Sequence, residues 1–189
     1  GRALTTADIL AAVPRAQAAR AEALQAAADI VADVRTRGEA ALREQAARFD
    51  RVSDHPIRVP QAHFDEALEG MDPGVRAAIE EAIRRVRIAS AAQVPAPVVT
   101  DIAPGARVEQ RWQPVRRAGG YVPGGKAAYP SSVVMNVVPA QVAGVADVAL
   151  ASPAQAEFDG RVDPDVLATA KLLGVTEVYA MGGAGAVGV

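Results

Sequence analysis

The chain has 189 residues, half of them apolar and 22% charged, with 20 basic against 22 acidic side chains. This balance argues against intrinsic disorder, and the lack of a basic excess argues against nucleic-acid binding. No cysteine is present, which excludes disulfides, thiolate zinc sites and cysteine nucleophiles. Because no apolar run reaches the length of about 18 residues that spans a membrane, and no signal-peptide pattern begins the sequence, we expect a soluble cytoplasmic protein without membrane contact.

Residues 1–94 form the first of three predicted parts, a helical N-terminal region. Apolar side chains recur there at three- and four-residue steps, which is typical of helices. In the first predicted helix, Pro14 suits the first turn and Gly38 suits the C-cap. The apolar faces of this helix and of the next consist of Leu24, Ala27, Val31 and Val34, then Leu42, Ala46 and Phe49.

The remainder of this region contains a short extended piece at 57–59 and a helix that opens at Pro73. Three arginines of that helix, Arg84, Arg85 and Arg87, lie close to Glu80 and Glu81. Because mixed charges of this kind usually face solvent, we interpret them as a solvated face rather than a binding patch.

Residues 95–116 are predicted to be a linker with two short strands joined by a Pro104-Gly105 turn. From 117 to 189, strands near 117–122, 147–152 and 177–181 alternate with two helices. The second helix is framed by Asp163 as N-cap and Gly174 as C-cap. This alternation predicts an α/β fold, in which the helical region is followed by a parallel βαβαβ unit resembling an incomplete Rossmann fold.

Two glycine loops, Pro123–Lys126 and Gly182–Gly185, directly follow predicted strands of this unit. In an open parallel sheet, ligands bind outside the carboxyl ends of the strands, so both loops are expected at one ligand-binding edge. Tyr121 and Tyr129 flank the first loop, where each either contacts a ligand or is a buried, tethered tyrosine.

The loops also match two phosphate-binding patterns incompletely. The first has the GxxxxGK spacing, but Ala127 stands where a P-loop needs Ser or Thr, and the next helix is predicted to start too late. The second spells GxGxxG from Gly183 to Gly188, a weak signal by itself, because this sequence does not allow a check of the helix that the pattern should open or of its acidic residue about 20 positions later. His55 and His63 are too far apart in sequence for a typical zinc pair and have no obvious third ligand.

Segment 117–141, with YVPGG at 121–125 and YPSSV at 129–133, closely resembles the signature of histidinol dehydrogenases. So do segment 30–50, which ends in Phe49-Asp50, and segment 172–184. The resemblance implies NAD-dependent oxidation of L-histidinol to L-histidine through the aldehyde, in a homodimer, with a zinc ion and a Glu-His pair. Family members are more than twice as long, and both the zinc ligands and this pair lie beyond the matched part. We therefore assign no catalytic or metal residue here and expect the chain alone to be inactive.

The resemblance carries over only the cofactor side. It matches Tyr121 to a tyrosine that contacts NAD, and it places Gly185 where the family pattern GGAQA has an NAD-contacting glutamine. We therefore expect weak NAD binding, which Gly185→Gln would strengthen. The predicted cofactor-binding residues are Tyr121, Pro123, Gly124, Gly125, Gly182, Gly183 and Gly185. Three alternatives remain: a non-catalytic nucleotide-binding or assembly module, a related dehydrogenase of polyol-type alcohols, and a P-loop-type phosphate binder.

Overall fold

The structure is a computed structural model that describes residues 5, 6, 8, 12, 18–125 and 127–189. Its helices are α2 (Ala18–Arg37), α3 (Glu39–Gln45), α4 (Gln61–Gly70), α5 (Pro73–Ala91), α6 (Pro130–Val142), α7 (Pro164–Leu172) and α8 (Gly183–Val187). A π-helical turn, η1 (Ala46–Asp50), and a 3-10 turn, η2 (Ala156–Phe158), complete the helical elements. Pro14 and Lys126, which carried two of the sequence predictions, lie outside the described residues. Within the described part, no helix has the length and apolar character of a membrane span.

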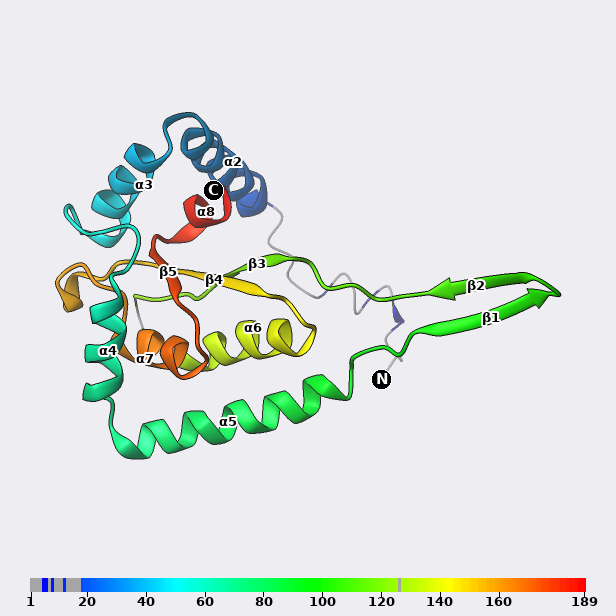
Figure 1. Cartoon of the computed structure of the whole chain (residues 1–189). Helices are drawn as coiled ribbons and strands as arrows, with labels where there is room; N and C mark the ends of the chain where they lie inside the picture. The colour runs from blue at the N-terminus through cyan, green and yellow to red at the C-terminus, as the bar shows by residue number, and fades with distance from the viewer. Residues whose placement is uncertain (1–4, 7, 9–11, 13–17, 126) are drawn as a thin grey trace.

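The predicted βαβαβ unit is present. Strands β3 (Arg117–Tyr121), β4 (Asp147–Ser152) and β5 (Glu177–Ala180) form a parallel sheet in the order β3-β4-β5. Helix α6 connects β3 to β4, and α7 connects β4 to β5 (Figure 1). The predicted strand limits agree with the observed ones within about a residue, and one helix follows each of the first two strands, so the α/β class expected from the alternation is confirmed.

The short extended piece before α4 adds itself to the free edge of β5. Arg58 forms an antiparallel bridge with Tyr179. The Val59 N–H donates to the Val178 carbonyl at 2.9 Å, and the Ala180 N–H donates to the Ile57 carbonyl at 2.6 Å. This pairing satisfies backbone groups that an open sheet edge leaves free, and it ties the helical region to the end of β5.

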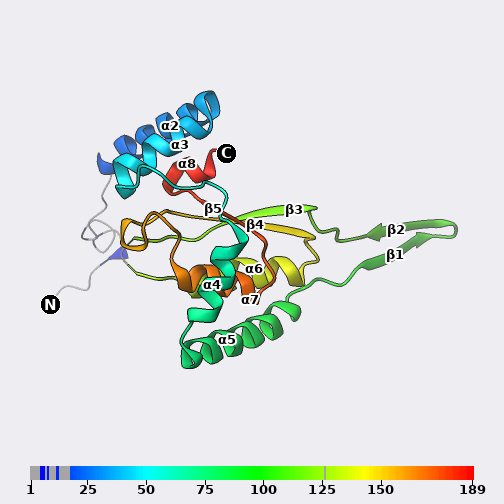
Figure 2. The same cartoon turned by 60° about the vertical axis from the view of Figure 1, so that its left-hand side comes forward.

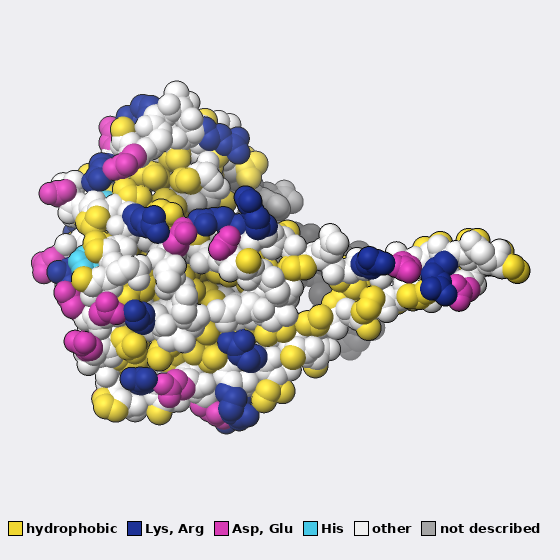
Figure 3. Space-filling model, viewed as in Figure 1, with side chains coloured by type: hydrophobic (Ala, Val, Ile, Leu, Met, Phe, Trp, Pro, Cys, Tyr) yellow, Lys and Arg dark blue, Asp and Glu magenta, His cyan; other side chains and the backbone are white. Residues whose placement is uncertain are grey.

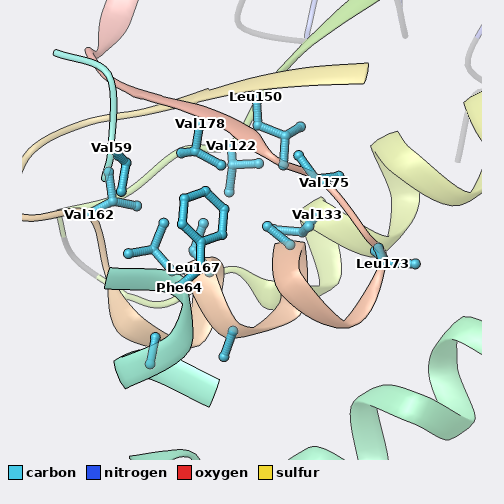
Figure 4. Packing of buried hydrophobic residues seen from close by; sticks show 14 of the residues in the cluster. Val59, Phe64, Val122, Val133, Leu150, Val162, Leu167, Leu173, Val175 and Val178 are labelled. Atoms are coloured by element: carbon cyan, nitrogen blue, oxygen red, sulfur yellow. The ribbon is translucent and has the colours of Figure 1, made fainter. Parts of the chain in front are cut away.

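Helices lie on both sides of the sheet. In both views α4, α5, α6 and α7 lie on one side, and α2, α3 and α8 lie on the other (Figures 1 and 2). The core on the first side consists mainly of valine and alanine around the fully buried Phe64 of α4 (Figure 4). Leu150, Val178 and Leu167 reach this core from β4, β5 and α7. The core therefore consists mainly of small side chains.

Predicted helix ends are also observed. The Asp163 carboxylate accepts hydrogen bonds from the backbone N–H groups of Asp165 at 2.8 Å and Val166 at 3.4 Å, which makes it the N-cap of α7. Gly38 and Gly174 have φ values of 57° and 73°, in the left-handed region that favours glycine after a helix. Arg84 and Arg85 pair with Glu81 on the exposed side of α5, as expected for a solvated face.

Two residues of the predicted apolar faces were placed wrongly. Leu24 is 71% exposed and Phe49 is 56% exposed. Helix α2 packs on α3 and on α8. Helix α8 is five residues long and meets α2 near Val31, where a Cβ on Gly188 would come within 3.2 Å. Leu24 lies about two turns before this contact, and in the described part of the chain it remains largely exposed although it follows the helical period.

Strands β1 (Val98–Ala103) and β2 (Ala106–Gln110) are the two short strands predicted on either side of the Pro104-Gly105 turn, and they pair as an antiparallel hairpin. The hairpin projects from the body as an arm (Figures 1 and 2). Apolar and charged side chains both lie along it in Figure 3. Ion pairs Asp101–Arg107 and Glu109–Arg111 lie within the arm itself.

Candidate cofactor site

The two glycine loops lie at the same edge of the sheet, as predicted. The loop after β3 and the loop after β5 are connected by the Tyr121 hydroxyl, which accepts a hydrogen bond from the backbone N–H of Gly183 at 3.1 Å. Tyr121 is the last residue of β3, and Gly183 is the first residue of α8. The hydrogen bond therefore spans the carboxyl ends of the outer two strands, above the end of β4.

The first loop needs glycine at two positions. A Cβ on Gly124 would lie 2.9 Å from both Gln155 Nε2 and Pro153 Cγ, which is too close for any side chain. Gly125 has a φ of 103°, and its N–H donates to Gln155 Oε1 at 3.3 Å. Gln155 is 8% exposed, and nothing in the surrounding sequence pointed to this contact. It holds the loop after β3 against the segment after β4.

The second loop packs on the same proline. A Cβ on Gly182 would lie 2.9 Å from Pro153 Cβ, and Gly183 has a φ of 59°. Pro153 therefore separates the two loops by little more than its own ring. The absence of side chains here leaves backbone peptide groups close to any ligand that lies across this edge.

The structure shows whether each of the two phosphate-binding patterns is followed by the helix that it requires. The GxGxxG segment does open a helix after a strand, because α8 begins at Gly183. The GxxxxGK segment does not, because α6 begins only at Pro130 and Ala127 offers no hydroxyl. Of the two segments, the second therefore has the strand and the helix that its pattern requires, although α8 has only five residues.

Gly185 occupies a different environment from the other glycines. It is buried, and the Cβ of any larger residue would collide with Gln45 Oε1 and lie 3.4 Å from Leu42 Cδ2, both on α3. The space beside position 185 is thus already filled by the amide of Gln45. The predicted gain in NAD affinity from Gly185→Gln stays a prediction, to which the structure adds a steric cost.

A cavity of about 670 Å³ lies between the sheet and the helices α2, α3 and α8. Tyr121 lines it, together with the small residues Gly119, Ala149 and Ala151. The remaining contacts come from Val34, Gly38, Glu39, Leu42, Ile57, Arg117, Gly120, Leu150, Tyr179, Met181, Ala186, Val187 and Val189. Parallel sheets are normally covered on both faces. On the side of α2, α3 and α8 the cover is incomplete, and the cavity gives access to the sheet next to the glycine loops.

An ion pair crosses this exposed face. Arg117 Nη2 on β3 lies 2.6 Å from Glu177 Oε2 on β5, and the Tyr179 hydroxyl donates to the same oxygen at 3.1 Å. These hydrogen bonds, first from Arg117 and then from Tyr179, hold the pKa of Glu177 below its ordinary value. The carboxylate is therefore charged at neutral pH and already paired.

The two histidines do not form a metal site with each other. His55 is buried, and its Nε2 lies 2.9 Å from the Ala180 carbonyl, which anchors the end of β5. His63 lies on α4, where burial and the charge of Arg161 lower its pKa. No group of three or more metal-ligating side chains occurs in the described ranges, so the residues present do not fit a zinc ion.

Asp50, at the end of η1, is a further polar residue at this edge. It is half-buried, and its Oδ2 lies 3.7 Å from the position of a Cβ on Gly182. Burial raises its pKa above the ordinary value, while the neighbouring His55 acts in the opposite direction. Its place next to Phe49 in the sequence gave no sign of this proximity, which arises only when η1 packs beside the second loop.

Comparisons with known proteins agree on one family. The histidinol dehydrogenase family model matches residues 13–189. The chain is 64% identical over 176 residues to the histidinol dehydrogenase of Leifsonia xyli subsp. xyli, a match that covers 93% of this chain and 40% of that protein. For the Bifidobacterium longum histidinol dehydrogenase the identity is 51%, covering 99% of this chain and 40% of that protein.

The fold agrees as well. The crystal structure of histidinol dehydrogenase from Elizabethkingia anophelis matches with a TM-score of 0.82 and 26% sequence identity, covering 93% of this chain and 39% of that chain. The chain thus spans about 40% of the length of these relatives. With the family model matched over nearly all of its residues, the chain belongs to the histidinol dehydrogenase family of oxidoreductases.

Proposed function

We propose that this chain forms the NAD-binding side of a dehydrogenase that oxidises L-histidinol to L-histidine, in histidine biosynthesis. The observation that carries the proposal is the hydrogen bond from the Gly183 N–H to the Tyr121 hydroxyl, at 3.1 Å. It brings the tyrosine and both glycine loops to the edge where parallel sheets bind nucleotides. The reaction and the substrate are inferred from the relatives named above, which are histidinol dehydrogenases.

The residues at this edge suit a dinucleotide. The ring of Tyr121 is 36% exposed and offers a face for stacking. A pyrophosphate can approach the backbone of Gly124, Gly125, Gly182 and Gly183 closely because no Cβ shields it, and Pro123 stiffens the entry to the first loop. The N–H groups of Gly125 and Gly183 already donate to Gln155 Oε1 and to the Tyr121 hydroxyl. We include Gly185 in the site through its place in α8. NAD, when bound, would accept the hydride, and this chain would hold and orient it.

The remaining features of the enzyme belong to the whole protein. We propose that it acts as a cytoplasmic homodimer and that zinc binds outside the described part of this chain. No step at zinc is assigned to the residues described here, because they do not fit the ion.

We also propose that the chain is organised as a helical region at 1–94, a connecting segment at 95–116 and a Rossmann-like unit at 117–189. Helices α4 and α5 of the first region share one core with the sheet of the third, so the first and third parts are packed together rather than independent.

The cofactor assignment can be tested with Tyr121→Ala. Loss of the ring and of the hydroxyl that orders Gly183 should weaken NAD binding about tenfold, from an affinity already in the millimolar range. Saturation-transfer NMR on NAD, which tolerates weak binding, would measure this. Trp112→Ala removes another exposed aromatic ring, at the base of the arm, and should leave the affinity unchanged. Equal affinities for wild type and Tyr121→Ala would contradict the proposal.

A further inference from the structure

A small, mainly apolar cavity lies beside the second glycine loop, and Tyr121 is not among the residues that line it. Its volume is about 140 Å³, several times the roughly 30 Å³ that one water molecule occupies in the liquid. Polar side chains of Gln45 and Asp50 line it, beside Gly182 and Gly183. Its other walls are Ile30, Leu42, Ala46, Phe49 and Ala184.

Both polar side chains lack a partner within the described part of the chain. Gln45 Nε2 is buried without a hydrogen-bond acceptor. The Asp50 carboxylate has neither a hydrogen bond nor an ion pair there, although it is half-buried, and burial raises its pKa. The cavity therefore offers one free donor and one free acceptor. A hydroxyl group satisfies both at once, because it donates and accepts hydrogen bonds.

The position of Asp50 matches a requirement of dinucleotide loops. In such loops an acidic side chain binds the ribose hydroxyls, and this side chain usually follows the glycines by about 20 residues. Here the carboxylate comes from much earlier in the chain. Packing of η1 against the second loop places Asp50 Oδ2 3.7 Å from a Cβ position on Gly182.

We propose that Asp50 determines cofactor specificity, accepting a hydrogen bond from the 2′-hydroxyl of the adenosine ribose of NAD, while the Gln45 amide donates to a ribose oxygen. The proposal rests on the proposed function, since it uses the same glycine loop. In NADP the 2′-hydroxyl is replaced by a phosphate, which would remove the donor and bring negative charge onto the carboxylate. The site therefore selects NAD over NADP.

The test compares NAD and NADP binding to the 189-residue chain by saturation-transfer NMR. Wild type should bind NAD about tenfold more tightly than NADP, as loss of a charge-assisted hydrogen bond implies. Asp50→Asn, which keeps the shape of the side chain, should bring the two affinities within about twofold. Asp54→Asn removes an exposed aspartate four residues away and should retain the wild-type ratio.

A second measurement needs no variant. In wild type, the ¹³C resonance of the Asp50 carboxyl should titrate at lower pH when NAD is bound, because a hydrogen bond to the carboxylate favours its charged form. Two results together would show that the ribose assignment is wrong while the proposed function stands. NAD would perturb Tyr121 without changing the Asp50 titration, and Asp50→Asn would retain the wild-type ratio of NAD to NADP affinity. If NAD does not perturb Tyr121 at all, the proposed function fails and this inference fails with it.

Discussion

Gln45 and Gly185 show how a single tertiary contact changes the meaning of a residue. In the sequence, Gly185 stands where the family pattern has a glutamine, so the side-chain amide of that position is absent. In the structure, the amide of Gln45 on α3 fills the space beside Gly185. The place of Tyr121 and of the glycine loops at one edge of the sheet could be predicted because they directly follow strands. The contacts of Gln45 and Asp50 could not, since they depend on how α3 and η1 pack against α8.

This contact gives a prediction for the family glutamine. Gly185→Gln alone should destabilise the chain by about 1–3 kcal/mol, because it overpacks the contact with Gln45. Adding Gln45→Ala should recover most of that loss, because it makes room for the new side chain. Urea unfolding of the four members of this double-mutant cycle gives the coupling energy.

Additive effects of the two substitutions would contradict the steric account. Leu42→Ala provides the matched control, since it removes the other side chain near Gly185 but leaves the amide of Gln45 in place. It should destabilise the chain by loss of packing without restoring the stability of Gly185→Gln.

At the scale of elements, predictions from local signals succeeded and predictions of burial partly failed. Capping residues, glycines and the alternation of strands and helices act within a few residues, so the limits of α7 and the sheet could be predicted. Burial depends on the partner, and Leu24 is largely exposed in the described part of the chain although it follows the helical period. The antiparallel bridge between Arg58 and Tyr179 had only a weak signal, an extended piece between two prolines.

The N-cap of α7 provides a test at this scale. Asp163→Ala removes the acceptor for the Asp165 and Val166 N–H groups, and should lower the free energy of unfolding by about 1 kcal/mol, within a range of roughly 0.5–2 kcal/mol. Asp163→Asn retains a capping oxygen and should recover most of the stability. Thermal or urea unfolding followed by circular dichroism would measure both. If the alanine and asparagine variants were equally stable, the capping role would be refuted.

In the whole molecule, the main core contains residues both of the helical region at 1–94 and of the βαβαβ unit at 117–189. Phe64 and Ile79 from the helical region lie in the same cluster as Val122 and Val178 of the parallel unit. The α/β class followed from the order of elements, but the placing of α2, α3 and α8 together on the opposite side of the sheet did not. That arrangement creates both the 670 Å³ cavity and the smaller one beside Asp50.

The central claim is that NAD binds at the carboxyl edge of the sheet, across the two glycine loops. The most direct test is a titration of the ¹⁵N-labelled chain with NAD, followed by amide chemical shifts. The account predicts the largest shifts at Tyr121, Gly124, Gly125, Gly182 and Gly183. Shifts confined to α2 or to the base of the arm near Trp112, with these five amides unchanged, would contradict it.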